Sequence, residues 1–511
     1  MVLVTPQQMK AIEKYSDSKG VSYGQLMQKA GYELAAFILN RPIDLSPGVL
    51  FFCGNGNNGG DALVAAKHLS EAGVAVTLAL MCGEPATEIS ARAFFDLSDS
   101  KAEVLFLNDN IDKIFNGISS AALIVDAVFG TGFHGELPPQ IKACFSYASR
   151  AQGTKLAVDI PSGGNGATGE AAEGTLHCDF TIAFGAKKVG MEFLPLKKHC
   201  GSVTVADIGI PKAAYSSVER PVARIEFSQM STILPERQAD AHKGNFGCLM
   251  NISGSRRMSG ACALSTLAAL RCGVGLCTTA APKSVVDSLS ANLYESMYLP
   301  MKETAKGEIA FSNAKDILTA CERADAVILG CGLGVSEDTQ KLVEFLLENI
   351  TCPIILDADG INCIAPRIDI IKNARASIIL TPHPGEMARL LQISVEEVTR
   401  DRMGWAVRLS GELGATVVLK GAPTVIAGEN GFCFVNSTGN PGLSRGGSGD
   451  VLSGMIGSFA AQGITPTDAA VAGVFLHGMA ADQVAGRLSM QGMLPGDVIA
   501  QLPLLFKQMN R

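Results

Sequence analysis

Two glycine-rich segments, each ending in an aspartate, carry the strongest chemical signals in this sequence. The first, Gly-Asn-Gly-Asn-Asn-Gly-Gly-Asp at residues 54–61, directly follows an apolar run. The second contains Gly446, Gly447 and Gly449 and ends at Asp450. A glycine-rich turn that opens a helix directs several backbone N–H groups at one point, where the helix dipole also favours an anion. Both segments predict binding of a phosphate-bearing ligand; a tight turn without a ligand is the alternative.

Neither loop has the spacing of the commonest nucleotide-binding motifs. Residues 54–61 do not fit Gly-x-Gly-x-x-Gly, and no ribose-binding acid follows about 20 residues later, which disfavours a dinucleotide-dependent dehydrogenase. The Asp450 loop is not a Walker A loop, because no Gly-Lys-Ser/Thr follows. Asp450 is instead placed to take a proton from a hydroxyl that attacks a phosphoryl group.

Further polar residues follow other apolar runs. Asp126 and Asp159 do so in the first half, and ligands bind at the carboxyl ends of parallel strands. We therefore expect Asp61, Asp126 and Asp159 to converge on one crevice, although each alone could be a helix cap. In the second half, residues 416–419 lead into Lys-Gly-Ala-Pro-Thr at 420–424, whose backbone and hydroxyl could hold nucleotide phosphates.

The elements that must position these residues alternate between strand and helix. In the first half, Thr5-Pro6 predicts a helix start, and apolar runs predict buried parallel strands at 49–53, 74–81, 123–126 and 156–160. This order predicts a Rossmann-like three-layer α/β/α domain. A second series of runs predicts another α/β domain, with strands at 246–250, 326–330, 354–357, 378–381 and 416–420 and three helices after Gly449. An irregular segment at 211–238 predicts a linker between domains at 1–216 and 225–508.

The composition argues against several classes of function. The net charge is −7 and the pI is near 5.6, so the chain lacks the basic footprint of a nucleic-acid-binding protein. The 14 cysteines include no CxxC pair, and we expect reduced, buried thiols in a cytoplasmic protein. No signal peptide is recognisable. The most apolar stretch, 260–281, contains Arg271 and predicts a buried helix and strand and not a membrane span.

The first half resembles the NAD(P)H-hydrate epimerase family. The resemblance covers about residues 1–215 and includes the aspartate-bearing segments and the motifs at 181–188 and 205–211. It implies that Asp159 is the acid/base at the hydrated nicotinamide carbon and that Asn58, Asp126 and Ser162 hold a potassium ion. It implies that the substrate is bound by Asn57, Asn58, Gly59, Gly60, Asp61, Gly130, Thr131, Gly132, Phe133, His134, Gly135 and Glu136. Gly163-Gly164 departs from the family pattern and predicts a looser loop.

The second half resembles the ribokinase-like superfamily and, within it, the NAD(P)H-hydrate dehydratase family. The motifs that carry this resemblance lie at 240–247, 330–334, 357–359, 381–387 and 440–454. The resemblance implies that Asp450 is the base that allows a nucleotide to phosphorylate the hydroxyl of the S-hydrate, after which phosphate leaves. It implies that the hydrate site includes Gly334 and His383, and that the nucleotide is bound by Lys420, Gly421, Ala422, Pro423, Thr424 and Gly449.

Three positions in the second half leave alternatives open. His383 lies between two prolines and could equally be a structural histidine in a turn. Arg445 stands where the family usually has a small residue, and it could contact a phosphate or point to solvent. Gly360 replaces the usual alanine after Asp-Ala-Asp, which we expect to be a minor change.

Together the two resemblances imply repair of hydrated NAD(P)H, in which the first domain interconverts the R- and S-hydrates and the second dehydrates the S-hydrate to NAD(P)H. The resemblance to fused bacterial members of this family implies that the phosphate donor is ADP with magnesium and not ATP, and that the products include AMP and phosphate. We expect a homo-oligomer that binds no nucleic acid and no membrane. One rival is a vitamin-type kinase that releases a stable phosphorylated product. The other is a first domain that has kept only its fold, against which the presence of Asp126 and Asp159 argues.

Overall fold

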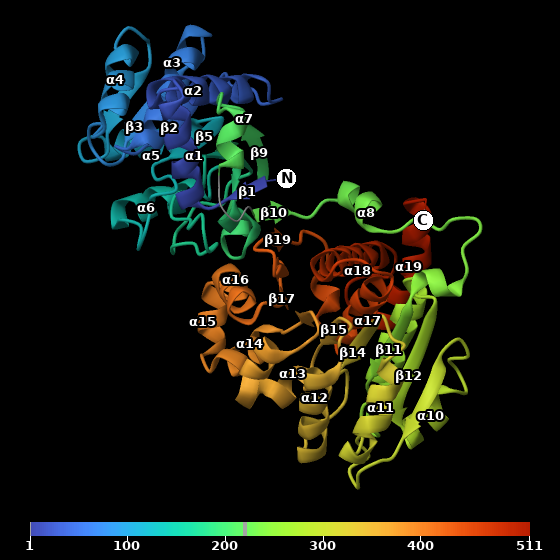
Figure 1. The fold of residues 1–511 in the computed structure, drawn as a ribbon. Coiled ribbons are helices and arrows are strands. Elements are labelled where there is room, and N and C mark those ends of the chain that lie inside the picture. Colours follow the sequence, from blue (N-terminus) through green and yellow to red (C-terminus); the bar gives the residue numbers. More distant parts are fainter. Residues whose placement is uncertain (1, 218–221, 511) are drawn as a thin grey trace. The chain divides into compact units, whose positions relative to one another are not determined.

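The computed structural model describes residues 2–217 and 222–510, which form two compact units (Figure 1). The first unit is Val2–Val222 and the second begins at Ala223. The division falls inside the predicted linker. That segment is more regular than expected, because it contains α7 (Lys212–Ser216), β10 (Val222–Arg224) and α8 (Phe227–Ile233), while residues 218–221 lie outside the described part.

The first unit is built on a seven-stranded parallel sheet of order β4-β3-β2-β5-β6-β7-β9. Its strands are β2 (Val49–Cys53), β3 (Val76–Leu80), β4 (Glu103–Phe106), β5 (Leu123–Ala127), β6 (Thr154–Val158), β7 (Phe180–Phe184) and β9 (Ser202–Ala206). Four of these were predicted from apolar runs. The strands β4, β7 and β9 were missed; β4 and β9 begin with exposed residues and lie at the two edges of the sheet.

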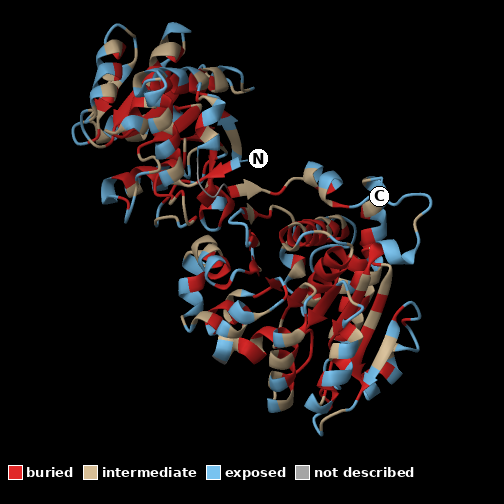
Figure 2. Ribbon diagram, viewed as in Figure 1, coloured by how far each residue is buried: buried red, intermediate tan, exposed pale blue. Residues whose placement is uncertain are grey.

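Helices cover both faces of this sheet, which confirms the three-layer α/β/α prediction. Alternate residues of β2 point to opposite faces: Phe51 packs with one helix layer, and Phe52 with the other. The first layer contains α1 (Pro6–Ser18), α2 (Tyr23–Leu39), α3 (Asn57–Glu71) and α4 (Glu88–Leu97); the second contains α5 (Ile111–Ser120) and α6 (Pro139–Ala148). Because both faces are covered, the strands β2 and β5 are buried throughout, as Figure 2 shows.

A short pair of strands lies outside this main sheet. The strand β1 (Val2–Val4) runs parallel to β8 (Lys187–Lys188), with Val4 opposite Lys188. Directly after β1, Thr5 caps α1 in a capping box with Gln8, and Pro6 occupies the first turn, as predicted.

The second unit contains a longer, mostly parallel sheet of order β13-β12-β11-β14-β15-β16-β17-β18-β19. Its strands are β11 (Cys248–Ile252), β12 (Leu276–Pro282), β13 (Met297–Met301), β14 (Ala326–Leu329), β15 (Ile354–Leu356), β16 (Ile378–Leu380), β17 (Thr416–Leu419), β18 (Val425–Ala427) and β19 (Cys433–Val435). The pairs from β13 to β17 are parallel, and β18 and β19 continue the sheet in antiparallel pairs. The second half thus forms an α/β domain with a largely parallel sheet, as the sequence predicted.

One face of the second sheet is covered by four helices that form a common apolar core with it. They are α9 (Ser259–Arg271), α17 (Ser448–Ala461), α18 (Pro466–Leu488) and α19 (Pro495–Gln508). The last three are the helices predicted after Gly449, and α17 begins one residue earlier. The remaining helices are α10 (Lys283–Leu289), α11 (Ala314–Cys321), α12 (Glu337–Asn349), α13 (Asp359–Ile364), α14 (Pro384–Leu391), α15 (Val395–Arg400) and α16 (Arg402–Leu413).

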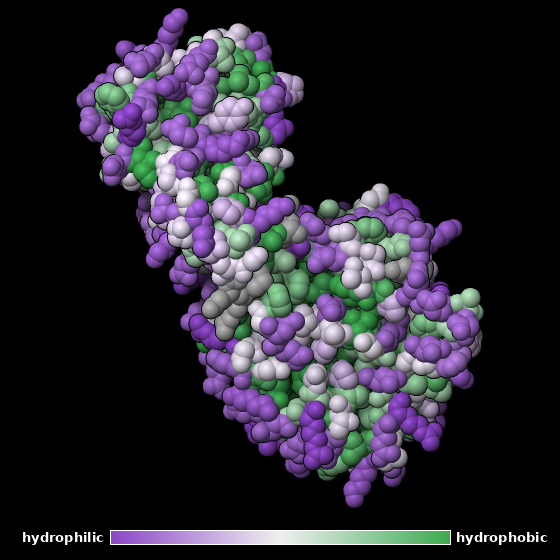
Figure 3. All heavy atoms as spheres, turned by 45° about the horizontal axis from the view of Figure 1, so that its top comes forward, coloured by the Kyte–Doolittle hydropathy of each residue, from purple (hydrophilic) through white to green (hydrophobic). Residues whose placement is uncertain are grey.

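Residues 260–281 fall in α9 and β12, as predicted for the most apolar stretch. Within the described residues, no helix combines the length and the apolar character needed to cross a membrane. On the face drawn in Figure 3, hydrophilic and hydrophobic residues are interspersed. All 14 cysteines are unpaired and most are buried, in agreement with the expected reduced thiols.

Candidate active sites

The first glycine-rich loop connects β2 to α3 and forms one wall of a cavity of about 390 Å³. Gly56 is the N-cap residue of α3 and supplies no side-chain hydrogen bond to the first turn. Other glycines in the loop are required by packing: a Cβ at Gly54 would overlap the Val128 carbonyl oxygen, and one at Gly59 would overlap the Gly54 carbonyl oxygen. The loop therefore combines a tightly packed turn with a helix end whose N–H groups have no side-chain cap.

Most of the residues expected in the first site line this cavity, but some do not. Those that line it are Asn57, Asn58, Asp61, Gly130, Thr131, Gly132, Phe133 and Asp159. Gly59 and Gly60 are buried behind the loop, and His134, Gly135 and Glu136 are exposed beyond the cavity lining. Asp126 and Ser162 are fully buried and also do not line it. Several further residues that line the cavity were not predicted from the sequence and lie on other elements: Glu13 and Met9 of α1, Tyr23 of α2, and Lys188 of β8.

Asp159 lies at the end of β6 in a conformation that few side chains adopt. Its φ is 63°, in the left-handed region, and its N–H donates to the Ile182 carbonyl at 2.8 Å. Its Oδ1 accepts from the Phe184 N–H at 3.1 Å and from Nζ of Lys188, with which it forms an ion pair. Lys188 is 1% exposed and also donates to the Phe184 carbonyl at 3.1 Å. Strained backbone of this kind persists where surrounding contacts fix it, and it is common at functional sites.

Three carboxyl groups and two ammonium groups, those of Lys10 and Lys188, line this cavity. Burial, and then the charges of Asp159 and Glu13, raise the pKa of Asp61 well above its ordinary value. Burial, followed by Asp159, likewise raises the pKa of Glu13. Burial and mutual repulsion thus favour the protonated forms of Asp61 and Glu13 beside the ion pair of Asp159 and Lys188. Such a set can both donate and accept a proton.

Asp126 and Ser162 tie two strand ends together beside the cavity. Oδ2 of Asp126 accepts from the Ser162 N–H at 2.8 Å, and its Oδ1 accepts from the Ser162 hydroxyl at 2.5 Å. The Ser162 Oγ also accepts from the Phe129 N–H at 2.8 Å. Burial outweighs these hydrogen bonds and raises the pKa of Asp126 to about 6. Asn58 lies against Gly130, and its buried Nδ2 has no hydrogen-bond partner among the described residues.

These residues fit a hard monovalent cation. The carboxylate of Asp126, the amide of Asn58 and the oxygens of Ser162 and Phe129 are all of the type that such a cation prefers. The unsatisfied atom of Asn58 is the Nδ2 donor, so a cation here would be bound by the amide oxygen Oδ1. The Gly163-Gly164 loop beside it is not looser than expected: a Cβ at Gly163 would overlap Thr175, and one at Gly164 would overlap Leu196. These glycines allow close packing, which does not favour the looser loop that the sequence predicted.

The second site centres on Asp450, in the first turn of α17. Gly447, the N-cap residue, has a φ of 99°, and no side chain caps the first N–H groups. A Cβ added to Gly449 would lie 3.5 Å from Nζ of Lys420 and 3.8 Å from Oδ2 of Asp357. The fold thus brings the two predicted loops together. Burial, and then the neighbouring Asp357 charge, raise the pKa of Asp450 to about 6.

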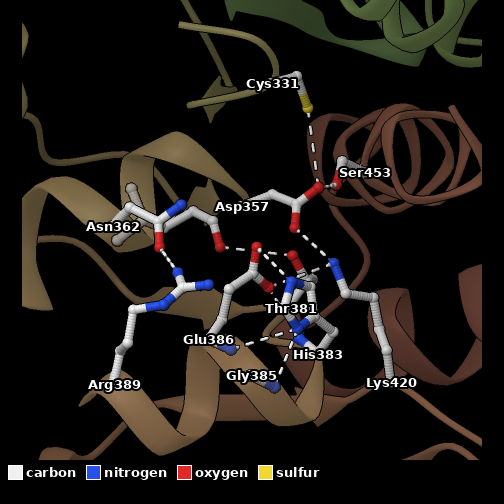
Figure 4. Close-up of polar contacts among 11 residues, drawn as sticks. Cys331, Asp357, Asn362, Thr381, His383, Gly385, Glu386, Arg389, Lys420 and Ser453 are labelled. Carbon is white, nitrogen blue, oxygen red and sulfur yellow. Dashed lines mark hydrogen bonds and ion pairs between the residues drawn. The ribbon is translucent and has the colours of Figure 1, made fainter. Parts of the chain in front are cut away.

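Asp357, which the sequence argument quoted only as part of a motif, organises the second site (Figure 4). Its Oδ1 accepts from Nζ of Lys420 at 2.9 Å, and its Oδ2 accepts from the Ser453 hydroxyl at 2.7 Å. Burial alone would raise the pKa of Asp357, but Lys420 and the hydroxyl donors outweigh burial and lower it. Ligand atoms of Cys331, Asp357 and Asp450 lie within 4.8 Å of one another. Asp357 is therefore ionised beside a carboxyl group that gives up its proton less readily.

His383 has a structural role that does not exclude a second one. It is the N-cap residue of α14, and its Nδ1 accepts from the N–H groups of Gly385 and Glu386 at 3.0 and 3.2 Å. Burial is the main cause that lowers its pKa, so the ring is neutral at pH 7 and carries its proton on Nε2. The Nε2 atom lies 3.4 Å from Oε1 of Glu386, and half of the side chain is exposed.

The other expected residues of the second unit surround these groups. Gly334 has a φ of 84°, and its N–H donates to Oδ2 of Asp359 at 2.8 Å. In the loop 420–424, the Thr424 hydroxyl donates to the Gly421 carbonyl at 3.1 Å, and Ala422 lies exposed at the tip before the buried Pro423. Arg445 is exposed and donates to the Gln491 carbonyl at 2.6 Å. Gly360 packs against Gly330, where an added Cβ would overlap the Leu329 carbonyl oxygen.

The fold and the two sites define an enzyme with two separate α/β units, each with its own reactive aspartates. Family models agree: residues 249–504 match the NAD(P)H-hydrate dehydratase family, and residues 23–190 match the YjeF-related protein N-terminus. The bifunctional NAD(P)H-hydrate repair enzyme of Moorella thermoacetica is 33% identical over 522 aligned residues, covering 100% of this chain and 97% of that protein. The chain belongs to the family of bifunctional NAD(P)H-hydrate repair enzymes.

Two solved structures are similar to the second unit. An ADP/ATP-dependent NAD(P)H-hydrate dehydratase from Bacillus subtilis, co-crystallized with ATP and Mg²⁺, is 31% identical with a TM-score of 0.49. It is matched over 56% of this chain and 98% of its own. The protein SMU.573 from Streptococcus mutans is 27% identical with a TM-score of 0.50, over 56% of this chain and 100% of its own.

Proposed function

We propose that this chain repairs hydrated NADH and NADPH in two steps, each carried out by one unit. The first unit interconverts the R- and S-hydrates, and the second dehydrates the S-hydrate at the expense of ADP, giving NAD(P)H, AMP and phosphate. The observation that carries this proposal is the pair of sites, each with an aspartate beside a partner of opposite charge at the carboxyl end of a strand. The domain bounds 1–216 and 225–508 belong to the same proposal.

In the first unit, Asp159 exchanges the proton that epimerisation requires. Its ion pair with Lys188 fixes its position, while Asp61, whose pKa is raised by burial and by nearby carboxylates, supplies a protonated partner. The substrate's phosphates would be bound near Asn57 and Asn58, at the N-terminus of α3, and near residues 130–136. A potassium ion held by Asn58, Asp126 and Ser162 would supply a fixed positive charge beside those phosphates.

In the second unit, Asp450 takes the proton from the substrate hydroxyl as the phosphoryl group arrives. The N–H groups around Gly449 and the loop 420–424 would hold the phosphates, and Gly334 and His383 would contact the hydrate. Loss of phosphate from one ring carbon and of a proton from the adjacent ring carbon then restores the dihydronicotinamide, because phosphorylation has turned a poor leaving group into a good one. Magnesium would accompany the nucleotide and neutralise its phosphates; Asp357 and Asp450 offer the carboxylate oxygens that this ion prefers. We also propose that the chain forms a homo-oligomer.

Two variants test the division of labour. Asp159→Asn should abolish epimerisation and leave dehydration of the S-hydrate intact, and Asp450→Asn should do the reverse, each losing about 100-fold or more of one activity. Chromatography of both hydrates and NADH, with ADP, ATP or no nucleotide, measures all the species. Equal loss of both activities in either variant would refute the assignment. A stable phosphorylated product would instead indicate a small-molecule kinase.

A further inference from the structure

Arg402, the first residue of α16, is a buried cation without a compensating charge. The residue is 8% exposed, and no carboxylate pairs with it among the residues that the structure describes. Its Nε has no hydrogen-bond partner there, and its Nη2 donates to the Leu419 carbonyl over a long distance of 3.4 Å. Buried arginines are normally paired with a carboxylate, so this one requires an explanation.

The position itself is unfavourable for a positive charge. Burial lowers the pKa of Arg402 to about 10, because the guanidinium has lost hydration without gaining a partner. The first turn of a helix is also the positive end of its dipole, and the first turn of α16 contains no acidic residue. The preceding Asp401 directs its Oδ1 to the Gly404 N–H at 2.8 Å and acts as a helix cap.

The loop 420–424 lies directly against this guanidinium. Gly421 is exposed and has a φ of 155°, and a Cβ at this residue would overlap Nη2 of Arg402. Leu419, whose carbonyl accepts from the same nitrogen, is the last residue of β17 before the loop. The absence of a side chain at Gly421 therefore places a cation behind the loop backbone.

The other cation of the loop is already compensated. Nζ of Lys420 lies 2.9 Å from Oδ1 of Asp357 and 3.7 Å from Oε2 of Glu386. A di- or triphosphate that binds here thus gains little positive charge from Lys420, and a guanidinium can bind two phosphate oxygens at once. We infer that Arg402 is an anion-binding residue of the phosphate-donor site and binds a phosphate group of a nucleoside diphosphate or triphosphate held at the loop 420–424.

This inference deepens the proposed function and rests on it only for the choice of ligand. It is tested with the full-length protein by calorimetric titration with ADP and with inorganic pyrophosphate, in the absence of any hydrate. Arg402→Met should weaken ADP binding by about tenfold or more, and Arg402→Lys should weaken it less. The matched control is Arg408→Met, which removes an exposed arginine from the same helix and should change the dissociation constant by less than about twofold.

Thermal unfolding without nucleotide distinguishes a role of Arg402 in ligand binding from a role in supporting the structure of the loop 420–424. Arg402→Met should not lower the melting temperature, because it removes an uncompensated buried charge. A lowered melting temperature with unchanged ADP affinity would overturn the inference and show that the arginine only supports Leu419. If Arg402→Met fails to fold, Arg402→Lys decides: unchanged ADP and pyrophosphate affinity would overturn the inference, and weaker binding at an unchanged melting temperature would support it.

Results that refute the proposed dehydratase function can be distinguished from results that refute the role of Arg402. A protein that binds ADP through Arg402 but dehydrates no hydrate would leave this inference standing and refute the dehydratase proposal. A protein that dehydrates the S-hydrate with ADP affinity independent of Arg402 would refute the inference alone. A wild-type protein that binds neither ADP nor pyrophosphate would also overturn it.

Discussion

At the scale of single residues, each site contains aspartates whose ionisation is set by their neighbours. Asp159 pairs with a buried lysine, and Asp61 in the same cavity has a raised pKa because of burial and nearby carboxylates. In the second site, Asp357 is kept ionised by Lys420, and its charge contributes to the raised pKa of Asp450. In each site, an aspartate paired with a lysine thus lies beside another aspartate whose pKa is raised.

The raised pKa of Asp450 predicts the pH dependence of dehydration. Asp450 must be deprotonated to act as a base, and burial with Asp357 raises its pKa to about 6. The rate of the S-hydrate reaction at saturating nucleotide should therefore fall about tenfold per pH unit below about 6 and level off above it. Initial rates of NADH formation between pH 5 and 8 measure this. A rate that stays constant down to pH 5 would contradict the role of Asp450.

The raised pKa of Asp126 predicts when potassium stabilises the protein. Asp126 is protonated below about pH 6, where its carboxyl group attracts a cation weakly, and it is ionised above. Replacing sodium chloride by potassium chloride should raise the melting temperature at pH 7.5 and have little effect at pH 5. The variant Asp126→Asn should lose the difference between the salts. A potassium effect of equal size at both pH values would show that the ion binds elsewhere.

At the scale of elements, the ends of the central strands could be predicted from the sequence. The residues that contact the aspartates at these strand ends could not. Continuous apolar runs marked the buried central strands, and the glycine-rich segments after them marked the loops, so Asp159 and Asp450 were found. Lys188 and Glu13 were missed because they reach the cavity from β8 and α1, which no local pattern connects to β6. Asp357 needed the distant Lys420 and Ser453 to show its role. The edge strands β4 and β9 were missed because their outer residues are exposed.

The packing of the β2–α3 turn predicts that substitutions at two of its glycines destabilise the protein to different extents. A Cβ at Gly54 would overlap the backbone of Val128, and one at Gly56 would meet nothing within 4 Å. Gly54→Ala should destabilise the first unit by about 2 kcal/mol or more, and Gly56→Ala by less than about 0.5 kcal/mol. Denaturant unfolding followed by circular dichroism measures both. The fluorescence of Trp405, the single tryptophan, reports on the second unit and should not change.

At the scale of the whole molecule, the two units have separate apolar cores and separate candidate sites. Every residue that lines the first cavity belongs to the first unit, and every contact of Asp357 and Asp450 described above belongs to the second. Among the described residues, neither site contains a residue of the other unit. Each unit should therefore contain all the residues that its own reaction requires.

This separation predicts complementation between inactive variants. A mixture of Asp159→Asn and Asp450→Asn proteins should convert the R-hydrate to NADH with ADP, because the S-hydrate made by one molecule can diffuse to another. Neither protein alone should do so faster than the spontaneous exchange of the hydrates. Chromatography of the mixture at increasing protein concentration measures the recovery. Absence of recovery would mean that the substrate does not leave the chain between the two steps.

The pairing of β1 with β8 ties the beginning of the described chain to the first active site. Val4 lies opposite Lys188 in this pair, and Lys188 is the residue that holds Asp159. Trimming residues 2–4, or crowding them with a bulky affinity tag, would therefore loosen the lysine and impair epimerisation while sparing dehydration. Protein preparations that differ only in a tag or truncation at residues 2–4 would then differ in epimerase activity and have the same dehydratase activity.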